Sequence, residues 1–171
     1  MENTKVIQND ARSIAFRRDS TTLVILGAGV IIFGFWTVLK VLAYIFLDIP
    51  LFDTSKYEIE SEEEYRFLMA FLFFFITSDL LVRLYVGARA IAEGLGKKVR
   101  KGYLVFNLWL ILFGIFSVIS VIMVLMEPDD EYIETYTSLF MELSSLTIII
   151  EVFIAALSVR RYKKTHIEGS R

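Results

Sequence analysis

The sequence predicts an all-α integral membrane protein: a four-helix transmembrane bundle in up-down-up-down order, with the N terminus and the C terminus both in the cytoplasm. Three observations support this prediction. The 171 residues contain four long apolar blocks separated by polar segments. Basic and acidic residues alternate between those polar segments. Hydrophobic residues make up 56% of the chain, with a mean hydropathy of +0.58, whereas a soluble domain has roughly 45–50% apolar residues.

Each apolar block is long enough to cross a bilayer, which takes ~20 mostly apolar residues because a helix rises about 1.5 Å per residue. We expect one membrane domain over 22–165, preceded by a cytoplasmic segment 1–21 and followed by a cytoplasmic tail 166–171. Four soluble helices of this composition would be apolar on every face and would have no polar face for water. The predicted spans, in chain order, are 23–46, 67–86, 104–126 and 138–159.

The second span has local signals at both ends. Ser61 and Glu64 have the spacing of a capping box, in which each side chain bonds to the backbone of the other. Gly94 and Gly96 follow the apolar block and are typical of a helix C-terminus. We therefore expect this helix to run from about 62 to 93 and to project beyond the membrane on both sides.

The charged residues between the blocks predict the orientation, because Lys and Arg near span ends stay on the cytoplasmic side. The basic residues are Lys5, Arg12, Arg17 and Arg18 before the first block, Arg89, Lys97, Lys98, Arg100 and Lys101 after the second, and Arg160, Arg161, Lys163, Lys164 and Arg171 after the fourth. The other two connections, 47–64 and 127–134, are acidic, with Lys56 as their one basic residue. All three basic segments then face the cytoplasm, and we expect the plasma (inner) membrane.

Composition excludes several kinds of chemistry. The chain has no cysteine and one histidine, His166, so thiolate nucleophiles, Cys-ligated zinc, iron–sulfur clusters and bis-His haem are not expected. The acidic connections lack the spaced ligands and glycine of a calcium loop. We expect no metal, no cofactor and no catalytic residue. The basic segments are explained by topology and anionic lipid, so they predict no nucleic-acid binding.

Ionisable residues inside a span cost roughly 2.5–3.5 kcal/mol each near its centre, so each one needs an explanation. Asp79 and Arg83 are four residues apart and share a helix face. Glu151 and Asn107 lie at a similar depth in the fourth and third blocks, and we predict that all four residues form one polar cluster. Two interpretations remain open: a proton, cation or substrate site in the inner half of the bundle, or a structural clamp that fixes helix register.

A second pair of ionisable residues lies nearer the outer side. Lys40 is about six residues from the outer end of the first block, and Glu142 lies at a comparable depth in the fourth. We expect them to form an ion pair with a structural role. The alternative is that each side chain extends separately toward the outer headgroups.

Small residues occur in the first and third blocks, where they allow membrane helices to approach closely. Gly27 and Gly34 are seven residues apart and share a face of the first helix. Gly114 and Ser117 lie in the third block. We expect these positions to pack against neighbouring helices of the same chain, and the alternative is a homodimer surface.

We recognise no known family in the sequence. Its small size, its short polar segments and its lack of catalytic residues favour a non-enzymatic integral membrane protein that is a subunit, partner or regulator of a larger membrane assembly. The alternative is a small transporter or an ion or proton channel that uses Asp79, Arg83 and Glu151. A cavity that reaches those residues would favour transport. The expected partners are the lipid bilayer and either another membrane protein or a second copy of this chain.

Overall fold

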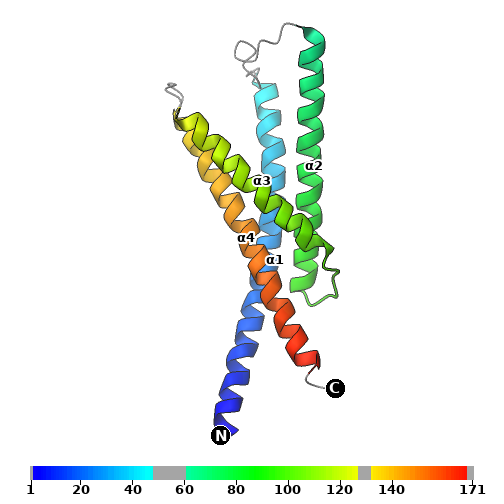
Figure 1. Ribbon diagram of the computed structural model, residues 1–171, viewed down its shortest axis with the longest axis vertical. Coiled ribbons are helices and arrows are strands. Elements are labelled where there is room, and N and C mark those ends of the chain that lie inside the picture. Colours follow the sequence, from blue (N-terminus) through cyan, green and yellow to red (C-terminus); the bar gives the residue numbers. More distant parts are fainter. Residues whose placement is uncertain (1, 48–60, 127–131, 169–171) are drawn as a thin grey trace.

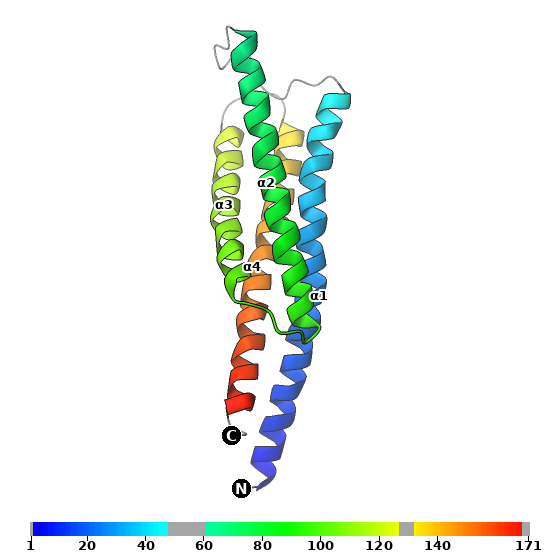
Figure 2. The same cartoon turned by 90° about the vertical axis from the view of Figure 1, so that its right-hand side faces the viewer.

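The computed structural model describes residues 2–47, 61–126 and 132–168. Within these ranges the protein is all-helical, and each helix contains a stretch long and apolar enough to cross a membrane. The N-terminal end of the first helix and the C-terminal end of the last lie at the same end of the molecule (Figures 1 and 2). The helices are α1 (Glu2–Phe46), α2 (Glu62–Gly94), α3 (Gly102–Leu125) and α4 (Tyr132–Glu168).

The predicted bounds of the second helix are confirmed. Ser61 is the N-cap of α2, and its Oγ accepts a hydrogen bond from the backbone N–H of Glu64 at 3.1 Å. At the other end Gly96 has φ +85°, a left-handed conformation that glycine adopts without strain and that reverses the chain after a helix. Gly94, in contrast, is the last helical residue and packs against α1.

Two helices continue well beyond their apolar blocks. Most of the polar segment 1–21 belongs to α1, and α4 continues past the basic residues that follow residue 159. Neither extension contains Gly or Pro, so nothing in the sequence interrupts the helix. The expected acidic connections lie mostly outside the described residues.

The helices form two pairs that cross each other. Figure 1 shows α3 and α4 together crossing the pair α1 and α2, with the two pairs diverging toward the end away from the termini. Within the bundle α1 packs chiefly on α2, and α4 contacts both α1 and α3. The buried apolar core lies in the half nearer the termini, built from Leu23 and Val30 of α1, Val86 and Ala90 of α2, Tyr103 and Leu110 of α3, and Ile149, Val152, Ala155, Ala156 and Val159 of α4.

Glycine allows α1 and α2 to touch backbone to backbone. A Cβ atom placed on Gly87 would lie 2.5 Å from the carbonyl oxygen of Gly27, and one on Gly94 would lie 2.6 Å from that of Ser20. These distances are too short for any larger residue, so the close approach depends on glycine at both levels.

Candidate functional site

Arg83 of α2 is the centre of a polar group inside the bundle. Its Nε lies 2.7 Å from Oδ2 of Asp79, one helical turn away, and its Nη1 donates a hydrogen bond of 2.7 Å to Oγ of Ser145 on α4. The Arg83 side chain is only 11% exposed, and the Asp79 side chain is 30% exposed. The guanidinium therefore joins the two crossing helix pairs, with its charge neutralised by Asp79.

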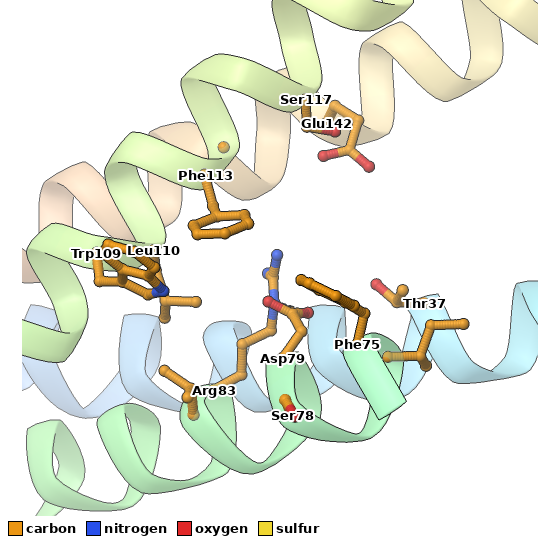
Figure 3. A pocket seen from close by; sticks show the side chains of 13 residues that line it. Thr37, Phe75, Ser78, Asp79, Arg83, Trp109, Leu110, Phe113, Ser117 and Glu142 are labelled. Carbon is orange, nitrogen blue, oxygen red and sulfur yellow. Dashed lines mark hydrogen bonds and ion pairs between the residues drawn. The ribbon is translucent and has the colours of Figure 1, made fainter. Parts of the chain in front are cut away.

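A cavity of about 340 Å³ opens beside this ion pair, between the two helix pairs (Figure 3). Its aromatic walls are Phe75 from α2 and Trp109 and Phe113 from α3. Its polar lining is Thr37 of α1, Ser78, Asp79 and Arg83 of α2, Ser117 of α3 and Glu142 of α4. All four helices thus contribute polar side chains to one space.

The cavity carries one carboxylate that no basic residue of the described part of the chain balances. Asp79 is paired with Arg83, but none of the described basic residues forms an ion pair with Glu142. Figure 3 shows Glu142 and Ser117 on one side of the cavity and the Asp79–Arg83 pair on the other. With both carboxylates ionised, the lining has a formal charge of −1.

The expected pairing of Lys40 with Glu142 is not present. The Nζ of Lys40 instead donates a hydrogen bond of 2.9 Å to Oγ of Ser138, one turn before Glu142 on α4. The Nζ of the exposed Lys40 side chain also lies 6.0 Å from the centroid of the Tyr44 ring, one turn further along α1. Glu142 remains directed into the cavity.

Glu151 does not join the Arg83 group. The α4 residue that reaches Arg83 is Ser145, six residues before Glu151, which corresponds to roughly 240° around the helix and about 9 Å along it. Glu151 is exposed, and no described residue hydrogen-bonds or ion-pairs with it. Exposed Thr147 and half-buried Ser144 lie on the same stripe of α4, which faces away from the cavity.

Asn107 lies apart from Arg83 as well, between α3 and α4. Its side chain is fully buried, and its Nδ2 donates a hydrogen bond of 3.3 Å to the carbonyl oxygen of Ile149. Its Oδ1 is buried without a hydrogen-bond partner among the described residues. Asn107 therefore links α3 and α4 in the buried core.

The small residues lie at contacts within the chain. A Cβ on Gly34 would be 3.2 Å from Cβ and Cδ of Arg83. The absence of a side chain at Gly34 therefore leaves room for the Arg83 side chain to lie against α1. Gly27 faces Gly87 of α2, as described above. Gly114 faces Leu146 of α4, whose Cδ1 would be 3.0 Å from an added Cβ. Ser117 lines the cavity.

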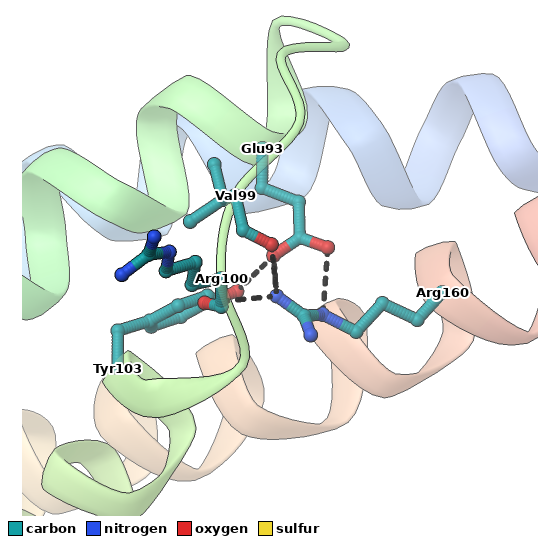
Figure 4. A network of polar contacts seen from close by, with 5 residues as sticks. All are labelled: Glu93, Val99, Arg100, Tyr103 and Arg160. Carbon is teal, nitrogen blue, oxygen red and sulfur yellow. Dashed lines mark hydrogen bonds and ion pairs between the residues drawn. The ribbon is translucent and has the colours of Figure 1, made fainter.

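A buried network that the sequence does not predict joins the helices at the end of the bundle nearer the termini (Figure 4). Tyr103 donates a hydrogen bond of 2.6 Å to Oε2 of Glu93, and Nη2 of Arg160 donates one of 2.7 Å to the same oxygen. The Nε of Arg160 lies 2.7 Å from the other carboxylate oxygen, and its guanidinium covers the Tyr103 ring at 5.4 Å. Glu93 is only 3% exposed, so one carboxylate joins α2, α3 and α4.

The first helix is attached at the same level. Ser158 of α4 donates a hydrogen bond to Oδ2 of Asp19, and the rings of Phe16 and Tyr162 stack with their centroids 4.5 Å apart. The two sets of contacts hold all four helices together at this end. The bundle is therefore tightly joined near the termini, and the cavity lies on the other side of its core.

Comparisons with known proteins find no relative: no family model matches the chain, and neither a curated protein nor a solved structure is detectably similar.

Proposed function

We propose that the chain is an integral protein of the plasma (inner) membrane, with four spans in up-down-up-down order and both termini in the cytoplasm. The charge distribution supports this orientation. The basic connection between α2 and α3 lies toward the same end as the two terminal extensions, which are also basic (Figure 2). Anionic lipid and the positive-inside rule both favour the cytoplasm for that end.

Within that membrane the chain acts as a non-enzymatic subunit or partner of a larger assembly. The observation that carries this proposal is the carboxylate of Glu151 on the exposed face of α4. Glu151 lies eight positions before Val159 at the end of the apolar block, which corresponds to about 12 Å along the helix. At that depth an exposed carboxylate meets lipid unless another protein covers it, and lipid contact costs up to about 3 kcal/mol.

The polar stripe of Ser144, Thr147 and Glu151 on α4 indicates which kind of partner would bind there. The hydroxyls of Ser144 and Thr147 donate to carbonyl oxygens of their own helix at 2.8 Å, which leaves their lone pairs available to a neighbour. The two hydroxyls can accept hydrogen bonds, and the Glu151 carboxylate carries a negative charge. The partner expected for them is a spanning helix with a Lys, an Arg or another hydrogen-bond donor at the depth of Glu151. A second copy on a twofold axis would instead place Glu151 against Glu151, and like charges oppose that arrangement.

Photo-cross-linking in the native membrane tests the assembly proposal. A photoreactive residue at Thr147 should link the chain to one other protein, at a span with a basic residue within a turn of the linked position. The matched control is the same group at Leu112, an exposed α3 position with only apolar residues three and four positions away, which should label lipid. Glu151→Leu should abolish the Thr147 product. A product with a second copy of this chain, or equal labelling from both positions, would contradict the proposal.

A second candidate is a small transporter, favoured by the cavity that reaches Asp79 and Arg83. The side chains that would bind a substrate lie on both helix pairs. A change in the angle between the α1–α2 pair and the α3–α4 pair would therefore alter the site. Transport also requires the Glu93–Tyr103–Arg160 network to open. Uptake of a solute by proteoliposomes that contain the purified protein, above the uptake by vesicles without it, would support this candidate. If Glu142→Gln leaves that uptake unchanged, the result opposes the candidate.

A further inference from the structure

The cavity between the helix pairs has the features of a binding site, independently of whether the chain joins an assembly. Its volume of about 340 Å³ is at the lower end of the range for small-molecule sites. Ligand sites of this kind combine apolar walls with a few polar groups that fix orientation. Here the walls are mainly aromatic, and polar side chains come from all four helices.

The charge of the lining selects the ligand. The charge of Arg83 is already neutralised by Asp79, and its Nη1 bonds to Ser145, whereas Glu142 has no ion-pair partner among the described residues. A half-buried carboxylate such as that of Glu142 is stabilised by a positive charge that enters beside it. The faces of Phe75, Trp109 and Phe113 attract a cation as well, because an aromatic ring has negative charge above its plane.

We propose that this cavity binds a small organic ammonium ion with an apolar body. The ammonium group lies beside the Glu142 carboxylate, and the apolar body lies against Phe75, Trp109 and Phe113. Such a group has two sources in a membrane: a free lipophilic cation and the headgroup of an aminophospholipid. Both present an ammonium group, attached directly to an apolar body in the first and through a phosphate to the acyl chains in the second, and the experiment separates them.

Trp109 provides a direct readout, because the chain has two tryptophans and the other, Trp36, is an exposed residue of α1 outside the cavity lining. In a Trp36→Phe background, the fluorescence of Trp109 is followed while benzyltrimethylammonium is added to the reconstituted protein. Neopentylbenzene has the same shape with carbon in place of nitrogen and is the uncharged control. We expect saturable binding of the cation and at least tenfold weaker binding of the uncharged compound.

Two variants locate the charge. Glu142→Gln should weaken binding of the cation at least tenfold, whereas Glu63→Gln, which removes a carboxylate from the exposed start of α2, should leave the affinity unchanged. Thermal unfolding of both variants in detergent checks that they fold. If Glu142→Gln does not fold, the ratio of cation to neopentylbenzene affinity in the parent protein decides, and a ratio near one overturns the proposal. Equal binding to Glu142→Gln, or no saturable binding to the parent, overturns it as well.

The source of the ammonium is separated by lipid composition. Vesicles contain the same fraction of phosphatidylglycerol, and the remainder is either phosphatidylethanolamine or a neutral glycolipid without an amine. If the headgroup is the natural occupant, phosphatidylethanolamine should compete and weaken the binding of benzyltrimethylammonium at least threefold. Equal affinity in the two membranes would indicate a free cation. Both results support an ammonium site.

Discussion

At the scale of single residues, the sequence predicts which polar groups need a partner but not always which partner they find. The spacing of Asp79 and Arg83 puts them on one helix face, and the structure has that ion pair. Depth and the polar stripe of α4 also predict Glu151 in this group, and the structure does not have it there. Depth gives the position along an axis, whereas contact also depends on rotation about it, and the polar stripe does not indicate which way α4 is turned.

The Arg83–Asp79 pair should contribute to stability because it is largely shielded from solvent. Removing Arg83 alone leaves the carboxylate of Asp79 without its cation inside a span. Arg83→Leu should therefore lower the free energy of unfolding by about 3 kcal/mol, and the Arg83→Leu/Asp79→Leu double variant should recover part of that loss. Thermal or denaturant unfolding in detergent measures both.

The chain contains a matched control for this experiment. Arg66 and Glu62 also form an ion pair at spacing i, i+4 and at 2.7 Å, but their side chains are 74% and 79% exposed. Arg66→Leu should change the stability by no more than about 0.5 kcal/mol. Equal losses for Arg66→Leu and Arg83→Leu would show that the Arg83 pair is not sheltered as described.

The hydroxyl of Tyr103 should also have a measurable effect, because it is fully buried and donates to the carboxylate of Glu93. Tyr103→Phe keeps the ring and removes one hydrogen bond to a charged acceptor, which should cost about 1.5–3 kcal/mol. Tyr85→Phe on the exposed face of α2 is the control and should be nearly neutral. The same unfolding assay compares them, and a neutral Tyr103→Phe would argue against a stabilising role for the network.

At the scale of the helix, composition predicts the elements well and their contacts poorly. Apolar blocks and a capping box were enough to predict α2 to within a residue at each end. The α1–α2 contact through Gly87 and Gly94 was not anticipated, although these glycines have the same seven-residue spacing as Gly27 and Gly34. Matching glycine spacings in two successive spans was the signal in the sequence that could have revealed this contact.

The α1–α2 contact predicts a large effect for a single methyl group. Gly87→Ala places a Cβ atom 2.5 Å from the backbone oxygen of Gly27, so one helix must move. We expect a loss of about 2–3 kcal/mol, despite the better helix propensity of Ala. Gly102→Ala, with no atom within 4 Å of the added Cβ, should be neutral or slightly stabilising. Unfolding of the two variants in one detergent checks this, and similar stability for both would contradict the close contact.

At the scale of the whole molecule, the described structure concentrates its buried residues and polar links near the termini, while the helix pairs diverge at the other end (Figure 1). The sequence does not predict this asymmetry, because both halves of each span are similarly apolar. The polar contacts that join α2, α3 and α4 involve Glu93, Tyr103 and Arg160, which lie at the ends of the apolar blocks. In the sequence, an ionisable residue at such a position cannot be distinguished from a residue of a solvated connection.

The proposed orientation predicts the result of a reporter experiment. Tags placed before Met1 and after Arg171 should both report the cytoplasm, and a reporter inserted at Ser55, in the acidic connection, should report the outside. A cysteine at the same three positions in this cysteine-free chain gives an independent measurement with a membrane-impermeant thiol reagent. Labelling of the terminal cysteines but not of Ser55→Cys in intact cells would show the opposite orientation and contradict the proposal.

The continuity of α1 has a mechanical consequence. Its 45 residues extend over about 68 Å, more than twice the thickness of the hydrocarbon layer, and contain no proline. The helix is fixed part of the way along, where Asp19 bonds to Ser158 and Ser20 touches Gly94. Further along, Gly27 faces Gly87 and Gly34 faces Arg83, so the span of α1 is held against α2 at several levels. Because the helix is continuous, a rotation imposed on its polar arm should be transmitted along the span to Thr37 in the wall of the cavity.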